Sequence, residues 1–77
     1  MEMGVVKFFD EIKKWGFIAR NNGEKDIFVH LSSLSEGLHT LVPDSLVQFT
    51  VGKGRTGQDQ AKDVFVVKEP EPNEEGD

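Results

Sequence analysis

The chain has 77 residues and no cysteine, which allows one small domain and excludes both a disulfide framework and a thiolate metal site. No apolar run is long enough to span a membrane, and the first residues lack the basic and apolar layout of a signal peptide. We therefore expect a cytoplasmic protein without a membrane partner.

The net charge of −5 is carried by one end of the sequence. Residues 1–68 carry nine acidic and nine basic side chains and are neutral together, whereas residues 69–77 carry five acidic side chains and no basic one. A neutral body still suits a polyanionic ligand if its cations gather on one face. We predict one folded domain over residues 1–68 and an acidic disordered tail over residues 69–77, where two prolines stand among the acids.

The first predicted strand covers residues 4–10 and contains Phe8 and Phe9 next to each other. Because side chains alternate in a regular strand, these two rings must point to opposite faces. A short turn over residues 10–13 leads into a second strand over residues 14–20. A third strand covers residues 26–31, and Asn22-Gly23 favours a tight hairpin between the two because both residues tolerate positive φ.

The strands of this predicted hairpin have one aliphatic face and one aromatic face. Alternation places Ile18, Ile27 and Val29 on the first face. The second face carries Trp15, Phe17, Phe28 and His30. If the aromatic face were the buried one, the aliphatic face would be left in water unless a second layer covered it, and a chain this short can hardly build one. We therefore predict an outward aromatic platform on which unpaired bases stack, with cations around it from Lys13, Lys14, Arg20 and Lys25.

The two halves of the hairpin also carry a family resemblance. The sequence KxWGFI over residues 13–18, followed by DIFVH over residues 26–30, resembles the paired RNA-binding motifs of the cold-shock domain in bacterial cold-shock proteins and Y-box proteins. The similarity covers roughly residues 4–67, and two motifs in the right order make it specific. The resemblance implies an oligonucleotide/oligosaccharide-binding (OB) fold, with Phe9 in the core and Phe8, where the family usually has Trp, on the binding face.

Combining the platform with the resemblance, we predict ten nucleic-acid-binding residues: Lys7, Phe8, Lys13, Trp15, Phe17, Asp26, Phe28, His30, Leu38 and Arg55. Asp26 could serve instead as a turn-ending residue that bonds backbone amides. Leu31 and Leu38 stand where the family commonly has Phe, so we expect weaker binding than in a relative with every ring. Lys14 replaces a common Gly, which leaves open an added phosphate contact or only a loss of turn freedom.

The rest of the chain completes an all-β domain. Residues 32–34 resemble the family's short helical turn, and residues 46–51 alternate with Val47, Phe49 and Val51 on one face. The glycine-rich loop over residues 52–58 lacks the ending of a phosphate-binding Walker motif and reads as a mobile connection. With a last strand over residues 61–68, the sequence predicts a small five-stranded antiparallel barrel, because closure removes exposed strand edges.

We therefore expect a monomer that binds single-stranded RNA and single-stranded DNA with little sequence preference, as an RNA chaperone or a regulator of transcription or translation. The alternative is a degenerate domain that binds another protein through its tail or apolar face. An enzyme is disfavoured because His30 and His39 stand in no recognisable nucleophile and base arrangement. The sequence indicates no cofactor, no metal site and no small-molecule substrate.

Overall fold

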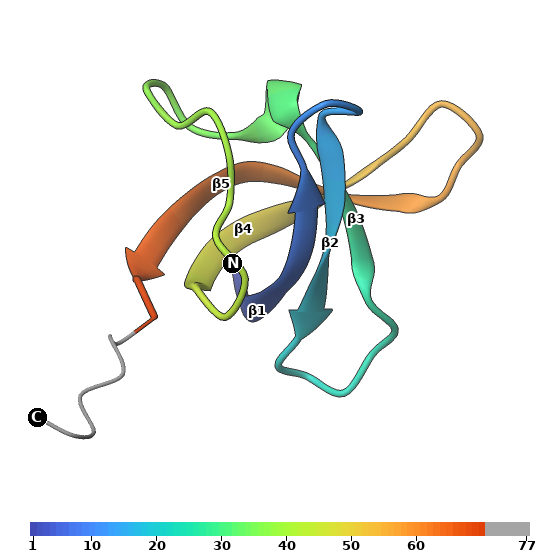
Figure 1. The fold of residues 1–77 in the computed structure, drawn as a ribbon. Coiled ribbons are helices and arrows are strands. Elements are labelled where there is room, and N and C mark those ends of the chain that lie inside the picture. Colours follow the sequence, from blue (N-terminus) through green and yellow to red (C-terminus); the bar gives the residue numbers. More distant parts are fainter. Residues whose placement is uncertain (71–77) are drawn as a thin grey trace, which may run out of the picture.

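The computed structural model of the chain describes residues 1–70, so residues 71–77 of the predicted tail lie outside the described residues. Five strands form a closed barrel in the order β1-β2-β3-β5-β4, as Figure 1 shows. The strands are β1 (Glu2–Asp10), β2 (Trp15–Arg20), β3 (Ile27–His30), β4 (Leu46–Lys53) and β5 (Asp59–Lys68). The predicted all-β, five-stranded barrel is confirmed.

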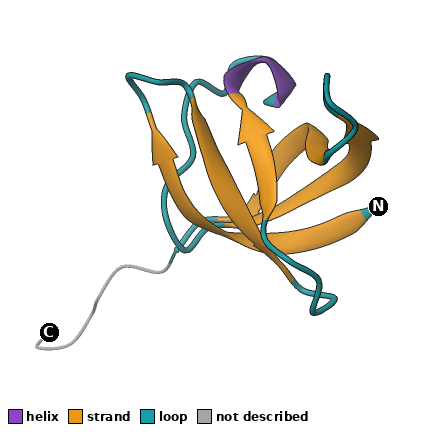
Figure 2. Cartoon of the chain, turned by 90° about the vertical axis from the view of Figure 1, so that its right-hand side faces the viewer, coloured by secondary structure: helices purple, strands orange, loops and turns teal. Residues whose placement is uncertain are grey.

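The barrel has one seam that is not antiparallel. β3 pairs with β5 in parallel through Phe28 and Gln60, whereas all other neighbours run antiparallel. A 3-10 turn, η1 (Leu31–Ser33), follows β3 directly and lies at one end of the barrel (Figure 2). Within residues 1–70 no helix is long and apolar enough to cross a membrane.

The barrel interior is filled by the aliphatic face that alternation predicts. Its buried members come from every strand and from the loop before β4: Val6, Ile18, Ile27, Val29, Leu41, Val47, Phe49, Ala61 and Val64. The inward assignment of Ile18, Ile27 and Val29 is therefore confirmed. Val51, which alternation groups with Val47 and Phe49, is 39% exposed, because it lies near the end of β4 from which the β4–β5 loop projects.

A β-bulge at Lys7 decides which ring of β1 faces outward. Val6 pairs with Ile18, but the next register pair joins Phe8 to Phe17, so Lys7 is the extra residue. Val6 is buried while Lys7 and Phe8 are both exposed, and Phe9 packs against the core. A bulge inserts one residue and so inverts the alternation beyond it. Without it, Val6 inward would have turned Phe8 inward and Phe9 outward.

The connection between β2 and β3 is longer than predicted. The last register pair is Ile18 with Ile27, and β2 ends at Arg20, so residues 21–26 form a six-residue loop and the predicted tight hairpin is wrong. Asn22 and Gly23 do turn the chain. The Asn22 side chain accepts a hydrogen bond from the amide of Glu24 at 2.9 Å, and Gly23 has a φ of 84°. The turn is local and does not set the register of the strands.

The β1–β2 turn is held tightly, and β2 begins at Trp15 and not at Lys14. The Asp10 carboxylate accepts hydrogen bonds from the amides of Ile12 and Lys13, each at 2.9 Å. Lys14 donates its amide to the Asp10 carbonyl at 2.6 Å and accepts one from Leu31 at 2.9 Å. Its φ is 71°, in the left-handed region that a side chain with a Cβ disfavours.

The turn predicts an unusual response to glycine. We expect Lys14→Gly to stabilise the protein by about 1 kcal/mol, because glycine adopts the left-handed conformation without steric cost. The melting temperature should then rise by roughly 4–8 °C for a domain of this size. Lys13→Gly is the matched control. Lys13 has no positive φ, so glycine there relieves no strain and only raises the chain entropy of the unfolded state, which lowers the stability. A lower melting temperature for both variants would show that Lys14 is not strained.

Candidate nucleic-acid interface

Four aromatic rings lie in mutual contact on the outer surface of β1, β2 and β3. Neighbouring ring centroids are 5.8 to 5.9 Å apart, and their planes are tilted or edge-on. The register brings them together, because Phe8 pairs with Phe17 and Phe17 pairs with Phe28. Paired residues of adjacent strands project on the same side of a sheet. We call these rings the aromatic platform: Phe8, Trp15, Phe17 and Phe28.

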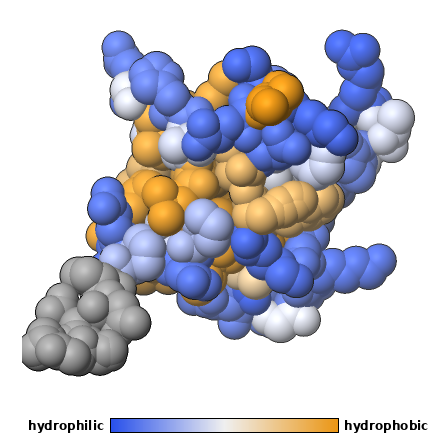
Figure 3. Space-filling model, in the orientation of Figure 1, coloured by the Kyte–Doolittle hydropathy of each residue, from blue (hydrophilic) through white to orange (hydrophobic). Residues whose placement is uncertain are grey.

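The platform is partly covered by its own members and partly open. Phe8 is 39% exposed and the other three rings are half-buried, although none belongs to the barrel core. Tilted and edge-on contacts between rings are favourable by about 0.5–1.5 kcal/mol per pair. The rings therefore hold one another in place while parts of their surfaces stay open to a flat partner. In the orientation of Figure 1, apolar surface is visible between polar side chains (Figure 3).

His30 extends this surface as a hydrogen-bond donor. It ends β3 opposite Trp15 and is exposed. Its Nδ1 accepts the backbone N–H of Ser32 at 3.1 Å and lies 3.0 Å from the Ser32 hydroxyl. Because a backbone N–H can only donate, Nδ1 is an acceptor and the neutral ring carries its proton on Nε2. The Nε2–H group is thus the one that a ligand beside Trp15 would meet.

Comparison with known proteins agrees with this arrangement. A family model described as "'Cold-shock' DNA-binding domain" matches residues 2–67, which cover all five strands almost completely. The chain belongs to the cold-shock domain family. This membership and the family resemblance of the two hairpin motifs point to the same fold.

Two of the similar proteins come from Vibrio cholerae and one from a plant. The chain is 47% identical over 60 residues to Cold shock-like protein CspA, covering 77% of this chain and 86% of that protein. It is 45% identical over 65 residues to Cold shock protein CspV, covering 83% and 91%. Glycine-rich protein 2 of Nicotiana sylvestris is 42% identical over 62 residues, which are 79% of this chain and 29% of that protein.

Two of the predicted site residues of this cold-shock domain contact each other. The Lys7 ammonium lies 3.0 Å from the Asp26 carboxylate, and both side chains are well exposed. An exposed pair of this kind contributes about 0–1 kcal/mol, so a ligand can displace it at small cost. The Asp26 carboxylate accepts its hydrogen bond from the Lys7 ammonium and not from a backbone amide within residues 1–70, so the structure does not support the alternative function of Asp26 as a turn-ending residue.

Arg20 lies beside the platform, but its charge is already neutralised. Its guanidinium donates to both Glu2 carboxylate oxygens, at 2.9 and 2.7 Å, and lies 3.7 Å from the Asp59 carboxylate. Only 10% of the side chain is exposed. Arg20 thus lies beside Phe17 and Phe28, where the sequence analysis placed it, but its ion pairs leave no free charge for a ligand. By contrast, Lys13, Lys14 and Lys25 are exposed, and no ion pair holds them within residues 1–70.

The remaining predicted residues lie outside the platform itself. Leu38 is partly buried and packs against the barrel core. Leu31 begins η1 and is partly buried as well, so the alternation of β3 stops before it. Arg55 is exposed in the β4–β5 loop, which projects beyond the barrel on the side of β2 and β3 (Figure 1).

Two shallow hollows adjoin the platform, one at each end. The larger, about 530 Å³, lies beside Phe17 and Phe28 and brings together the β2–β3 loop and the start of β5. Its rim includes Glu24 and Gln58, two polar side chains that the sequence analysis did not select. Barrel closure brings these loops together, and no local pattern in either loop signals it. The smaller hollow, about 300 Å³, lies beside Phe8, Trp15 and Lys13.

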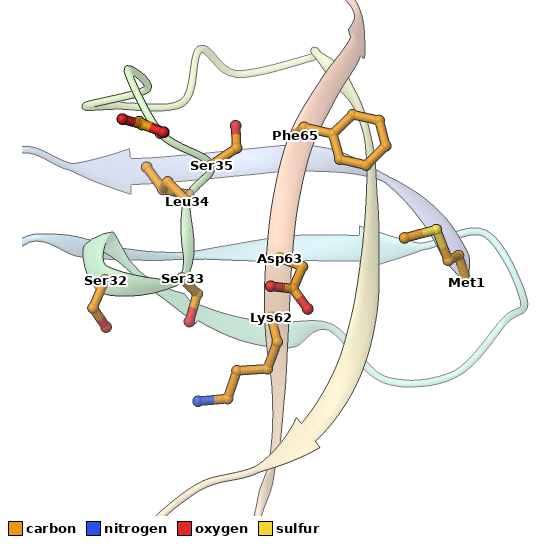
Figure 4. Close-up of a pocket in the computed structure, with 9 residues that line it drawn as sticks. Met1, Ser32, Ser33, Leu34, Ser35, Lys62, Asp63 and Phe65 are labelled. Carbon is orange, nitrogen blue, oxygen red and sulfur yellow. The ribbon is translucent and has the colours of Figure 1, made fainter.

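A third hollow lies away from the platform, between η1 and β5, as Figure 4 shows. It measures about 460 Å³ and contains none of the ten predicted residues. Phe65 on its wall is 38% exposed, which is close to the exposure of Phe8. This ring supplies a matched control for the platform rings. In residues 1–70 no three His, Asp or Glu side chains gather in a way that could hold a metal ion.

A chain of ion pairs joins four of the strands. Glu2 of β1 pairs with Arg20 of β2, which also approaches Asp59 of β5, and Asp59 pairs with Lys53 of β4 at 2.7 Å. The Arg20 hydrogen bond lowers the pKa of Glu2, and the Lys53 hydrogen bond lowers the pKa of Asp59. A carboxyl with a lowered folded pKa adds stability above its unfolded pKa and loses that contribution as the pH falls.

This linkage predicts an acid-dependent role for Glu2. We expect Glu2→Gln to destabilise the protein by up to about 1 kcal/mol at pH 7, where the Glu2 carboxylate pairs with Arg20. The difference from the unmodified protein should shrink between about pH 5 and pH 3, as Glu2 becomes protonated in both states. Urea unfolding across this range measures it. Glu36→Gln, which removes an exposed carboxylate without an ion pair in residues 1–70, should show no such convergence.

Proposed function

We propose that this cold-shock domain binds single-stranded RNA and DNA with little sequence preference. The observation that carries the proposal is the aromatic platform, four rings in contact on the outside of a barrel whose hydrophobic core contains none of them. Bases stack on aromatic side chains with about 1–3 kcal/mol each, whatever their identity. Duplex DNA hides its base faces, so the platform favours unpaired strands.

The charged side chains support the same reading. Lys13, Lys14 and Lys25 surround the platform without ion pairs in residues 1–70, and the Lys7–Asp26 pair is weak enough to open. Free cations beside a stacking surface attract the phosphate backbone without reading sequence. We propose that the function resides in residues 1–68 and that it keeps RNA unpaired as a chaperone. The cytoplasmic location and the monomeric state stay predictions.

Removing single rings tests the platform directly. We expect Phe17→Ala and Phe28→Ala each to weaken binding of a fluorescently labelled single-stranded pyrimidine oligonucleotide by roughly 5- to 150-fold, which corresponds to one lost stacking partner. Both variants should stay folded because neither ring belongs to the core. Fluorescence anisotropy measures affinity without relying on Trp15, whose own emission the substitutions would disturb.

The control is Phe65→Ala, which removes a ring of similar exposure to Phe8 from another face and should leave the affinity unchanged. The unmodified protein should also bind single strands far more tightly than duplex DNA of equal length. If duplex binds as well, or if Phe65→Ala weakens binding as much as Phe17→Ala does, the platform is not the binding surface. That result would favour the alternative of a protein-interaction module.

Leu31 and Leu38, which stand where the family commonly has Phe, have different surroundings in the structure. Leu31 begins η1 beside His30, whereas Leu38 packs on the core. We therefore expect Leu31→Phe to tighten single-strand binding by roughly 5-fold or more, since it adds one ring next to the platform. Leu38→Phe enlarges a side chain that already packs against the core, so its first effect should be a lower melting temperature. Equal affinities for Leu31→Phe and the unmodified protein would contradict this placement.

A further inference from the structure

The β1–β2 turn holds Lys14 in a strained left-handed conformation. The turn needs this conformation, but it does not need a lysine to adopt it. Lys14 has a φ of 71°, and both its amide and its carbonyl are fixed, by Asp10 and by Leu31. Glycine would make the same two backbone hydrogen bonds without strain, because they involve no side-chain atom. What lysine supplies and glycine lacks is an ammonium group on a long side chain. Strain that persists in this way points to a function of the side chain.

The ammonium of Lys14 differs from several other cations of the domain in being unpaired. Lys7 pairs with Asp26, Lys53 pairs with Asp59, and Arg20 pairs with Glu2. Lys14 is exposed, and no carboxylate within residues 1–70 lies within ion-pair distance of it. Its full charge is thus offered to solvent or to a ligand. The turn is closed by backbone and Asp10 contacts, so the charge is not needed to hold it.

The position of Lys14 fits a ligand that crosses the platform. It immediately precedes Trp15, and the hollow lined by Phe8, Trp15 and Lys13 lies at this end of the rings. The sugar and phosphate of a nucleotide stacked on Trp15 would therefore lie within reach of the β1–β2 turn. The fixed backbone of Lys14 restricts where its ammonium can reach, because the left-handed residue is bonded on both sides.

We infer that Lys14 is a phosphate-binding residue and that the nucleic-acid site extends past Trp15 onto the β1–β2 turn. The ligand group is the phosphodiester backbone of a single strand. Such a contact adds affinity and salt dependence and does not discriminate among bases. The inference rests on the proposed function, and it names one residue whose charge the bound strand neutralises.

The test separates the charge of Lys14 from its backbone. Lys14→Asn removes the charge and tolerates the left-handed conformation, whereas Lys14→Arg keeps the charge. Anisotropy with a labelled oligothymidylate, from 50 to 200 mM salt, gives the slope of log K against log salt. We expect Lys14→Asn to reduce the magnitude of that slope by about 0.7, the value for one phosphate contact on a single strand. We expect Lys14→Arg to keep the original slope.

The control for net charge is Lys68→Gln, which removes one positive charge at the end of β5. This end lies at the left of Figure 1, far from the β1–β2 turn at the top and from β2 and β3 at the right. An unchanged slope in Lys14→Asn, or an equal reduction in Lys68→Gln, would overturn the inference. Melting temperatures check the folds, and a purely structural role would change them without changing the slope. If the unmodified protein binds no single strand at all, the proposed function fails as well.

Discussion

A barrel of five short strands has one small interior. The limited volume of that interior decides which side chains are buried and which must lie on the outer surface. The nine buried hydrophobic residues fill it, and the only ring among them is Phe49. Each strand alternates, so the side chains that do not enter the interior must project outward from the same strands. Phe8, Trp15, Phe17 and Phe28 of β1, β2 and β3 belong to this outward set, whereas Phe9 of β1 packs against the core. The same alternation of side chains that fills the core therefore places most of the platform rings on the outer surface of the barrel.

The β-bulge in β1 interrupts this alternation. Lys7 and Phe8 both face outward in consecutive positions, and Phe9 then returns to the core. Bulges bend a strand and redirect the side chains beyond them. Here the bulge aligns Phe8 with Phe17 and Phe28 in one row across three strands, and it leaves the ammonium of Lys7 at the edge of that row. In a regular strand Phe9, and not Phe8, would have faced outward.

The sequence was sufficient for those features that depend on a local period. The faces of β2 and β3 follow from strict alternation, and so does the burial of Val47 and Phe49 in β4. The outward Phe8 could only be assigned through the family resemblance, because a bulge leaves no mark in the pattern. The length of the β2–β3 loop was misjudged because Asn22-Gly23 turns the chain without joining the strands.

Features that depend on several distant segments could not be predicted at all. The ion pairs of Arg20 join residues 18 and 39 positions apart in the sequence, and they exist only because closure brings β1, β2 and β5 together. The sequence therefore places Arg20 among the cations around the platform but gives no sign of its two carboxylate partners. Within a small neutral body, a largely buried and paired cation such as Arg20 is not available for phosphate contacts. On the proposed function, affinity for phosphate depends mainly on the exposed lysines without an ion pair in residues 1–70, and a phosphate contact by Lys14 would account for a strained lysine at the end of the platform.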